Sequence, residues 1–220
     1  LFDKLSYQCS QKVTSMYSTS FSLAVKMLSP KIQKDIYARY GFVRFAEEIV
    51  DTFHDFDKEI LLDEFENDLD KAIERRISLN PILNSFQEVV HKNNIEKALI
   101  DHFMKSMRAD LYKSEYQSIE EYEDYIYGSA DVVGLMCLKV FVQGDQKKYD
   151  ELKGPAMKLG SAFQKVNFLR DIKDDTEDLH RSYFPHIQGG VIDSAAKEQI
   201  IDEINKDFQE AYEGILQLPI

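Results

Sequence analysis

Apolar residues recur along most of the chain with the three-to-four-residue spacing of amphipathic helices, and polar, Asn- or Pro-containing breaks separate the helical segments. The alternating pattern of a strand never extends over a useful length, so we predict an all-α fold. The 220 residues show no repeat, low-complexity segment or linker. They suit one large helical domain spanning residues 1–220.

Capping and breaking residues predict where the helices begin and end. Two helices are expected within residues 1–29, on either side of the polar stretch 17–20. Pro30 opens the next helix, which carries residues 40–51 and ends before the acidic turn at 55–57. Further boundaries are expected at Asn80-Pro81, at Asn93-Asn94, at the capping box Ser118–Glu121, at the turn Gly189-Gly190, and around a last amphipathic helix from about Ser194 to Leu216.

The segment from Phe163 to Pro185, FQKVNFLRDIKDDTEDLHRSYFP, has one acidic helix face. Asn167, Asp171 and Asp175 stand four residues apart, with Arg170 beside them. Two carboxylates at i and i+4 can hold a hard divalent cation through oxygen. A solvated helix face is the alternative reading in so acidic a protein. The opposite side is expected to pack through Phe163, Val166, Leu169 and Ile172.

A second acidic stripe lies far away in the sequence, in YGFVRFAEEIVD from Tyr40 to Asp51. Tyr40, Arg44, Glu47 and Asp51 recur at i, i+4, i+7 and i+11, and the opposing apolar stripe consists of Phe42, Phe45, Ile49 and Phe53. Both stripes place an arginine next to paired carboxylates. Solvated faces have no reason to repeat that arrangement, so the repetition favours a functional site.

Composition narrows the classes of partner. A hydrophobic content of 44% with 14 Phe and 12 Tyr is enough to bury a core and still line an apolar cavity with rings. The formal net charge of −12 argues against nucleic acid and against electrostatic docking on anionic lipid. An anionic substrate would therefore need metal ions or a few placed arginines.

The cysteines and apolar runs predict a cytoplasmic protein. Cys9 and Cys137 have no partner spacing that indicates a disulfide framework or a zinc site, which fits a reducing compartment. The N-terminus lacks a signal-peptide pattern, and the longest apolar run, Val132 to Leu138, is too short to span a bilayer. Any membrane contact is expected to be peripheral, at the inner face of the membrane.

Two segments have both a structural and a functional interpretation. Ser18 and Ser20 precede an apolar run, where serines cap helices, and the free N–H groups at a helix start also favour an anion. Gly128, Ala130 and Gly134 lie within an expected helix, where each glycine costs roughly 1 kcal/mol relative to alanine. They indicate either close helix packing or a groove for a ligand.

A different class of protein also has a formal claim. Glu88–His91 and Glu177–His180 are both ExxH, the pair that di-iron carboxylate bundles place on two helices. His91 runs into an expected helix end, and Glu177–His180 lies in a cluster of charge. With 39 acidic residues, such pairs arise by accident, so this alternative ranks second.

The two acidic stripes resemble those of the squalene/phytoene synthases, all-helical enzymes that join two prenyl diphosphates. The motif NFLRDIKDD, followed by Arg181 and YFP, carries most of the resemblance, and RFAEEIVD is looser. The family usually has aspartate where this chain has Glu47, which puts tight metal binding there in question. The resemblance implies an isoprenoid-synthase-like helical bundle around a central cavity. Relatives run longer, so C-terminal helices are expected to be missing.

The resemblance also implies roles for individual residues. Glu47, Asp51, Asp171 and Asp175 would be the metal carboxylates, and Tyr40, Arg44, Arg170 and Arg181 would contact the leaving diphosphate. Ser18 and Ser20 would hold a substrate diphosphate, and Gln164 and Asn167 would line the acidic face. The isoprenoid wall would consist of Phe21, Tyr125, Ala130 and Gly134.

The implied reaction is the Mg²⁺-dependent condensation of two geranylgeranyl diphosphates to phytoene through a cyclopropylcarbinyl diphosphate, in carotenoid biosynthesis. Mn²⁺ is the expected substitute cation. NADPH is not expected; the chain has no Gly-rich dinucleotide motif, although this family does not rely on one. The nearest alternative is squalene or dehydrosqualene synthesis from farnesyl diphosphate. Another is a member of the fold that no longer catalyses, for which Glu47 is the hint. The pocket depth that selects the C15 or C20 substrate, and the oligomeric state, are not encoded in a readable pattern.

Overall fold

The computed structural model describes residues 1–116, 118–177, 183–184 and 194–219; the side chains of residues 173–177 lie outside this description. The structure is 82% helical and its described part contains no strand, so the predicted all-α class is confirmed. Contacts divide the chain into two compact units. Unit 1 comprises residues 1–97 and 139–145, and unit 2 comprises 98–138 and 146–220. The expected single domain and its central cavity remain predictions.

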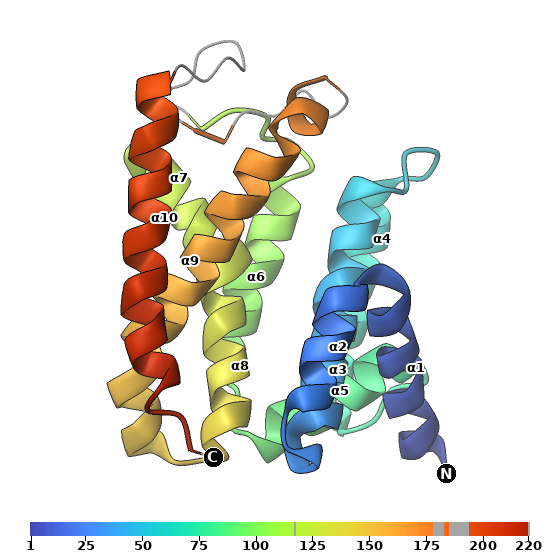
Figure 1. Cartoon of the computed structure of the whole chain (residues 1–220). Coiled ribbons are helices and arrows are strands. Elements are labelled where there is room, and N and C mark those ends of the chain that lie inside the picture. The colour runs from blue at the N-terminus through green and yellow to red at the C-terminus, as the bar shows by residue number, and fades with distance from the viewer. Residues whose placement is uncertain (117, 178–182, 185–193, 220) are drawn as a thin grey trace. The chain divides into compact units, whose positions relative to one another are not determined.

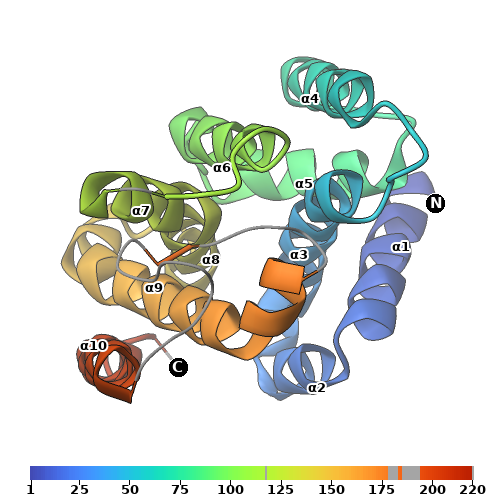
Figure 2. The ribbon, with the colours of Figure 1, turned by 90° about the horizontal axis from the view of Figure 1, so that it is seen from above.

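Unit 1 contains five helices in the order in which they follow in the sequence: α1 (Phe2–Tyr17), α2 (Thr19–Met27), α3 (Pro30–Asp51), α4 (Lys58–Arg75) and α5 (Pro81–Lys92). Helix α1 packs against α3 and α5, and α4 covers the other side of α5 (Figure 2). The centre of this packing is a stack of rings, in which the centroids of Phe42 and Phe86 lie 4.0 Å apart. Both rings are fully buried.

The helix boundaries in unit 1 follow local capping chemistry and confirm the predicted breaks. Ser18 Oγ accepts a hydrogen bond from the Phe21 N–H at the start of α2, and Asp57 does the same for α4. Asn80 caps α5, with Pro81 at its first position, where the missing N–H is not needed. Pro30 opens α3 as expected.

Unit 2 contains α6 (Lys97–Ala109), α7 (Ile119–Ile126), the π-helical turn η1 (Tyr127–Asp131), α8 (Val132–Val142), α9 (Gln146–Glu177) and α10 (Ser194–Ile215). The first residue of α6 and the residues of α8 after Leu138 belong to unit 1. Ser118 Oγ accepts a hydrogen bond from the Glu121 N–H at the start of α7, which confirms the predicted helix start at Ser118. Helices α9 and α10 run side by side (Figure 1). The expected turn at Gly189-Gly190 lies outside the described residues.

A buried polar network fastens α10 to α9. The carboxylate of Asp207 on α10 accepts hydrogen bonds from Lys158 and Lys165 at 2.8 Å each, and from Ser161 Oγ at 3.0 Å. Burial alone would raise the pKa of Asp207, but these three bonds outweigh it and hold that pKa below its usual value. Asp131, at the end of η1, lies close enough to this network to feel its charges.

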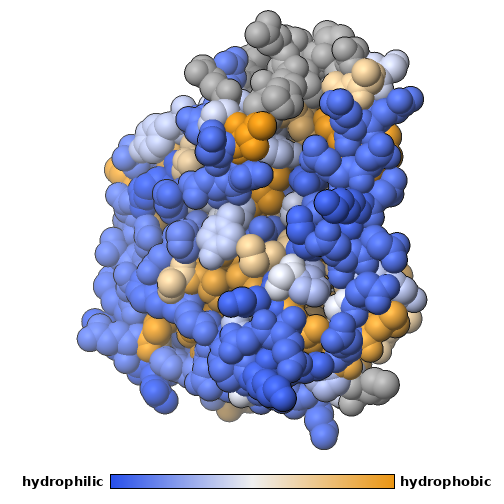
Figure 3. All heavy atoms as spheres, turned by 90° about the vertical axis from the view of Figure 1, so that its left-hand side faces the viewer, coloured by the Kyte–Doolittle hydropathy of each residue, from blue (hydrophilic) through white to orange (hydrophobic). Residues whose placement is uncertain are grey.

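The expected packing face of α9 is partly wrong. Val166, Leu169 and Ile172 do pack on an aromatic cluster centred on Phe168, which is 4% exposed. Phe163, however, is 56% exposed and packs edge-to-face with Phe208 on α10, with ring centroids 5.5 Å apart. The surface that carries α10 and α7 accordingly shows separate apolar patches in a mostly hydrophilic face (Figure 3). The cause is that α7 meets α9 near Phe168, so the apolar stripe is rotated toward that residue.

Residues Ile119–Val142 form one continuous helical stretch that, by length and composition alone, could cross a membrane. The predicted apolar run, Val132 to Leu138, is only a part of this stretch, because η1 joins α7 to α8 without a break. Of its apolar window, 67% is buried inside the protein, as in the core helix of a globular protein. The stretch is therefore weak evidence for a membrane span.

Candidate active site

Unit 1 carries the first acidic stripe on α3, where Arg44 is held in place from two sides. Its guanidinium lies 2.6 Å from Glu48 Oε2 and 3.4 Å from Glu47 Oε2. The same group lies over the ring of Tyr17, 4.5 Å from the centroid. Glu48 and Tyr17 were not among the site residues predicted from the sequence. The i,i+4 spacing could have indicated Glu48, whereas Tyr17 belongs to another helix.

The carboxyl of Glu47 sits in an unfavourable place for a charge. Burial raises the pKa of Glu47 to about 7; the cation of Arg44 lowers it, and the nearby Asp51 raises it again. Its side chain is still 35% exposed, so water screens these effects and no free energy follows from the shift. The effect of Asp51 on the pKa of Glu47 means that the two carboxyl groups lie near each other on α3.

The start of α2 meets the same part of α3. Ser18 is the N-cap of α2, which supports its structural interpretation, and Ser20 is exposed. The ring of Phe21 stacks on Tyr40 with centroids 4.9 Å apart. Burial and the charge of Glu47 raise the pKa of Tyr40, opposed by Arg44, so its hydroxyl stays a donor at neutral pH. The structure thus brings Ser18, Phe21 and Tyr40 together.

Unit 2 carries the second acidic stripe on α9. Arg170 Nε and Nη2 lie 2.7 and 2.5 Å from the two carboxylate oxygens of its neighbour Asp171, a bidentate pair on the helix surface. Asn167 donates to Gln164 Oε1 at 3.4 Å, one turn earlier. Asp175 lies in α9 with its side chain outside the description, and Arg181 lies outside the described residues.

Tyr125 is buried in the aromatic cluster of unit 2 rather than on an open wall. Its ring packs on Tyr116 and Tyr183, and its hydroxyl donates to Asp110 Oδ2 at 3.0 Å. Burial, followed by the charge of Asp110, raises the pKa of Tyr125 well above its usual value. No sequence pattern indicated Asp110, because it lies in the turn after α6 and has no periodic relation to Tyr125 on α7.

The small residues of η1 and α8 allow a close approach of helices. A Cβ on Gly134 would lie 2.5 Å from the carbonyl oxygen of Ala156 on α9, and one on Gly128 would meet Ser106 and His102 of α6. Ala130 is buried at the same place. These contacts support the packing interpretation of both glycines, and a substrate groove at Ala130 and Gly134 remains a prediction.

The described residues contain no group of three His, Cys, Asp or Glu side chains that could hold a metal ion by themselves. In the competing di-iron motif, His91 Nε2 lies 2.8 Å from the carbonyl oxygen of Ile73, and Glu88 pairs with Lys34 at 3.9 Å. His180 lies outside the described residues. Neither His91 nor Glu88 is therefore arranged as an iron ligand.

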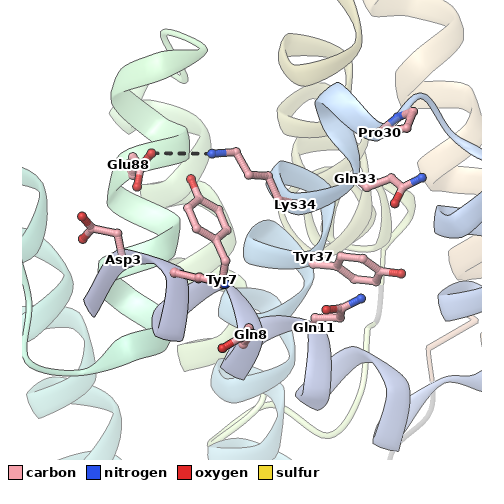
Figure 4. Close-up of a pocket in the computed structure, with 10 residues that line it drawn as sticks. Asp3, Tyr7, Gln8, Gln11, Pro30, Gln33, Lys34, Tyr37 and Glu88 are labelled. Carbon is pink, nitrogen blue, oxygen red and sulfur yellow. Dashed lines mark ion pairs between the residues drawn. The ribbon is translucent and has the colours of Figure 1, made fainter. Parts of the chain in front are cut away.

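A polar pocket of about 570 Å³ lies in unit 1, lined by α1, the start of α3 and α5. In Figure 4, Lys34 extends over the Tyr7 ring toward Glu88. None of the site residues predicted from the sequence is among its ten lining residues. The pocket is therefore separate from the acidic stripe of unit 1.

The fold and the two acidic stripes together define a class of protein. It is an all-α protein in which two helices each carry carboxylates beside an arginine, an arrangement that is a candidate for binding diphosphate. Comparison with known proteins makes the class specific: residues 14–187 match the model of the squalene/phytoene synthase family. The chain belongs to that family, which confirms the resemblance.

Relatives of this chain occur in plants and bacteria. It is 30% identical over 182 residues to phytoene synthase 2, chloroplastic, of Oryza sativa subsp. japonica, covering 81% of this chain and 45% of that protein. It is 29% identical over 178 residues to the phytoene synthase of Pseudescherichia vulneris, covering 76% and 56%. The chain thus spans about half the length of the curated relatives it matches.

Two solved structures share the fold. One is a dehydrosqualene synthase in complex with a ligand, with a TM-score of 0.86, 21% identity and coverage of 99% of this chain and 79% of that one. The other is the squalene synthase HpnC of Alicyclobacillus acidocaldarius, with a TM-score of 0.83, 20% identity and coverage of 99% and 86%. At these identities the likeness shows the fold alone.

Proposed function

We propose that this chain catalyses the Mg²⁺-dependent head-to-head condensation of two geranylgeranyl diphosphates to phytoene. Membership of the squalene/phytoene synthase family supports a condensation of this kind, and the relatives named phytoene synthases favour the C20 substrate. The observation that carries the proposal is the repeated pairing of an arginine with stripe carboxylates, Arg44 with Glu47 on α3 and Arg170 with Asp171 on α9.

The residues fit a hard divalent cation. Glu47, Asp51 and Asp171 offer carboxylate oxygens, the donors that Mg²⁺ prefers. Mg²⁺ typically takes one or two carboxylates and completes its shell with water and substrate phosphate, so a stripe without a three-carboxylate cluster suits it. We propose Glu47 and Asp51 as ligands in unit 1, and Asp171 and Asp175 in unit 2. Bound Mg²⁺ would stabilise the negative charge that develops on a leaving diphosphate.

The chain's own residues supply the remaining electrostatics. Arg44 and Arg170 present positive charge to the diphosphates, Arg44 from a side chain already fixed by Glu48 and Tyr17. Tyr40 keeps its proton and can donate it in a hydrogen bond to a diphosphate oxygen. The stacked ring of Phe21 excludes water beside Tyr40 and offers its face to a carbocation. Ser18, Ser20, Gln164, Asn167 and Arg181 complete the proposed binding set.

The proposed reaction proceeds in two ionisations. Loss of diphosphate from the first substrate leaves an allylic cation at C1, which the double bond of the second substrate captures to form a cyclopropylcarbinyl diphosphate with release of a proton. Loss of the second diphosphate, ring opening and loss of a further proton then give a C1–C1′ linked triene. This route consumes no reductant, so NADPH is not part of the proposal.

The experiment is an incubation of purified protein with farnesyl and geranylgeranyl diphosphate separately, with and without Mg²⁺, followed by mass identification of the hydrocarbon. A Mg²⁺-dependent C40 product is expected. A C30 product would instead indicate squalene or dehydrosqualene synthesis. Mn²⁺ is expected to replace Mg²⁺ in the assay. No hydrocarbon from either substrate, in a folded protein, would refute the proposal.

A matched pair of variants separates the site from general acidity. Asp171→Ala is expected to abolish product, whereas Asp68→Ala, which removes an exposed carboxylate of α4 paired with Lys71, is expected to leave it unchanged.

Cell fractionation tests the proposed cytoplasmic location with peripheral membrane contact. The protein should leave the membrane fraction in high salt or carbonate.

A further inference from the structure

The π-helical turn η1 places a hydroxyl against the acidic face of α9. Ser129, in the middle of η1, accepts a hydrogen bond at 3.2 Å from Gln164 Nε2, thirty-five residues later in the chain. Turns of this kind are rare and often occur at functional sites. Gly128 lets η1 approach α6, where a Cβ would collide with Ser106. The position of Ser129 is thereby set by close packing on the side of α6.

The direction of the Ser129 hydroxyl is also determined. Its oxygen lies 2.8 Å from the carbonyl oxygen of Tyr125, one turn earlier, so its single proton is donated there. Toward Gln164 the oxygen can then only accept. The amide of Gln164 must present its NH₂ group to Ser129, and its carbonyl oxygen is left to accept from the Asn167 NH₂ group at 3.4 Å.

A chain of three hydrogen bonds therefore fixes the polarity of both amides. The NH₂ group of Asn167 points back along α9 to Gln164, so the carbonyl oxygen of Asn167 is directed away from Gln164. Asn167 lies one turn before Asp171, on the proposed Mg²⁺ and diphosphate face. An amide turned the other way would present a donor to a cation, which would repel it.

We propose that Ser129 is a positioning residue that sets the amide orientation of Gln164 and Asn167 on the acidic face of α9. This inference rests on the proposed function, because it takes Gln164 and Asn167 as residues of the proposed Mg²⁺ and diphosphate face. Ser129 itself need not touch the substrate. Its contribution passes through Gln164.

Two variants and one control test the positioning role. Ser129→Ala removes the hydroxyl and is expected to lower kcat/KM about 5- to 10-fold, the value of one hydrogen bond, with the melting temperature little changed. Ser129→Thr keeps the hydroxyl and is expected to restore kcat/KM to within about threefold of the wild type. The control is Ser15→Ala, an exposed serine on α1 that also donates to its own helix, at Lys12 O, and is expected to have no effect.

A double-variant cycle distinguishes positioning from a general structural effect. If Ser129 acts through Gln164, adding Ser129→Ala to Gln164→Ala lowers kcat/KM no further than Gln164→Ala alone. Independent losses that multiply in the double variant would overturn the proposal, as would full activity of Ser129→Ala. A structural role would lower stability in both backgrounds.

Side-chain amide NMR keeps this test separate from that of the proposed function. In ¹⁵N-labelled protein, Ser129→Ala is expected to shift the side-chain NH₂ signals of Gln164 and Asn167, and Ser15→Ala is expected to leave them in place. Unchanged signals would overturn the hydrogen-bond chain. If Ser129→Ala shifts these signals but the wild-type protein turns over neither prenyl diphosphate, the contact is confirmed, and the proposed function and the positioning role are both refuted.

Discussion

Asp131 is the residue whose replacement is expected to change the pH dependence of stability most. It ends η1 with 9% of its surface exposed. Burial raises the pKa of its carboxyl to about 7; Lys158 and Lys165 on α9 lower it, as does a hydrogen bond from the Ser161 backbone, and Asp207 on α10 raises it. The folded protein therefore holds a proton on Asp131 across a range in which the unfolded chain has lost it.

The sign and size of the effect follow from proton linkage. An unfolded aspartate has a pKa of about 3.9, so between about pH 4 and pH 7 the folded state binds one more proton than the unfolded state. Its contribution to stability is thus complete below about pH 4 and is lost as pH rises, by about 1.4 kcal/mol per pH unit. The loss amounts to about 4 kcal/mol once the pH exceeds 7. Asn at this position cannot ionise and keeps a carbonyl acceptor for the Ser161 N–H.

The assay is urea denaturation of wild type and Asp131→Asn at intervals from pH 5 to pH 8. From pH 5 to pH 8, the free energy of unfolding of the wild type is expected to fall by about 3 kcal/mol relative to that of the variant. Asp124→Asn is the control: it removes an exposed carboxylate on α7, 63% accessible and paired with Lys105, and should give a nearly constant offset below about 1 kcal/mol. Wild-type and Asp131→Asn curves that run parallel would refute the reasoning.

Three further predictions concern the site and its packing. Asp171→Ala and Asp175→Ala should each abolish turnover with the helical circular-dichroism signal nearly unchanged; loss of the signal in both would favour a structural role. Glu47→Asp should keep or raise activity in the hydrocarbon assay, and a collapse would mean that the first motif is misaligned. Gly134→Ala should lower the free energy of unfolding in urea by about 1–3 kcal/mol, because its Cβ would meet Ala156 O at 2.5 Å; unchanged stability would favour the groove.

Local chemistry made much of the fold and of each stripe readable from the sequence. Ser18, Asn80 and Ser118 cap helices through their own backbone neighbours, two or three residues away, so the pattern of residues is sufficient to place those boundaries. The spacing of Arg44 and Glu47 on one helix face likewise follows from the helical period alone. The family resemblance rests on such short segments, and the family match confirms it.

Tertiary structure decided the contacts between residues with no periodic relation. Ser129 of η1 contacts Gln164 of α9, and Asp207 of α10 binds Lys158 and Lys165 of α9. Tyr125 of α7 donates to Asp110 in the turn after α6. These pairings depend on the angle and rotation at which the helices pack, and hydrophobic periodicity defines a face only to within about one residue.

The same rotation decided which phenylalanine of α9 is core. The sequence pattern predicts Phe163 on the packing face of α9 and does not include Phe168, but the aromatic cluster of unit 2 lies against Phe168, and Phe163 faces solvent. The sequence by itself determined the helices, their caps and the two acidic stripes, because those follow from interactions within a turn or two of chain. The packing of one helix on another determined which side chains are buried, because burial depends on surfaces that distant segments supply.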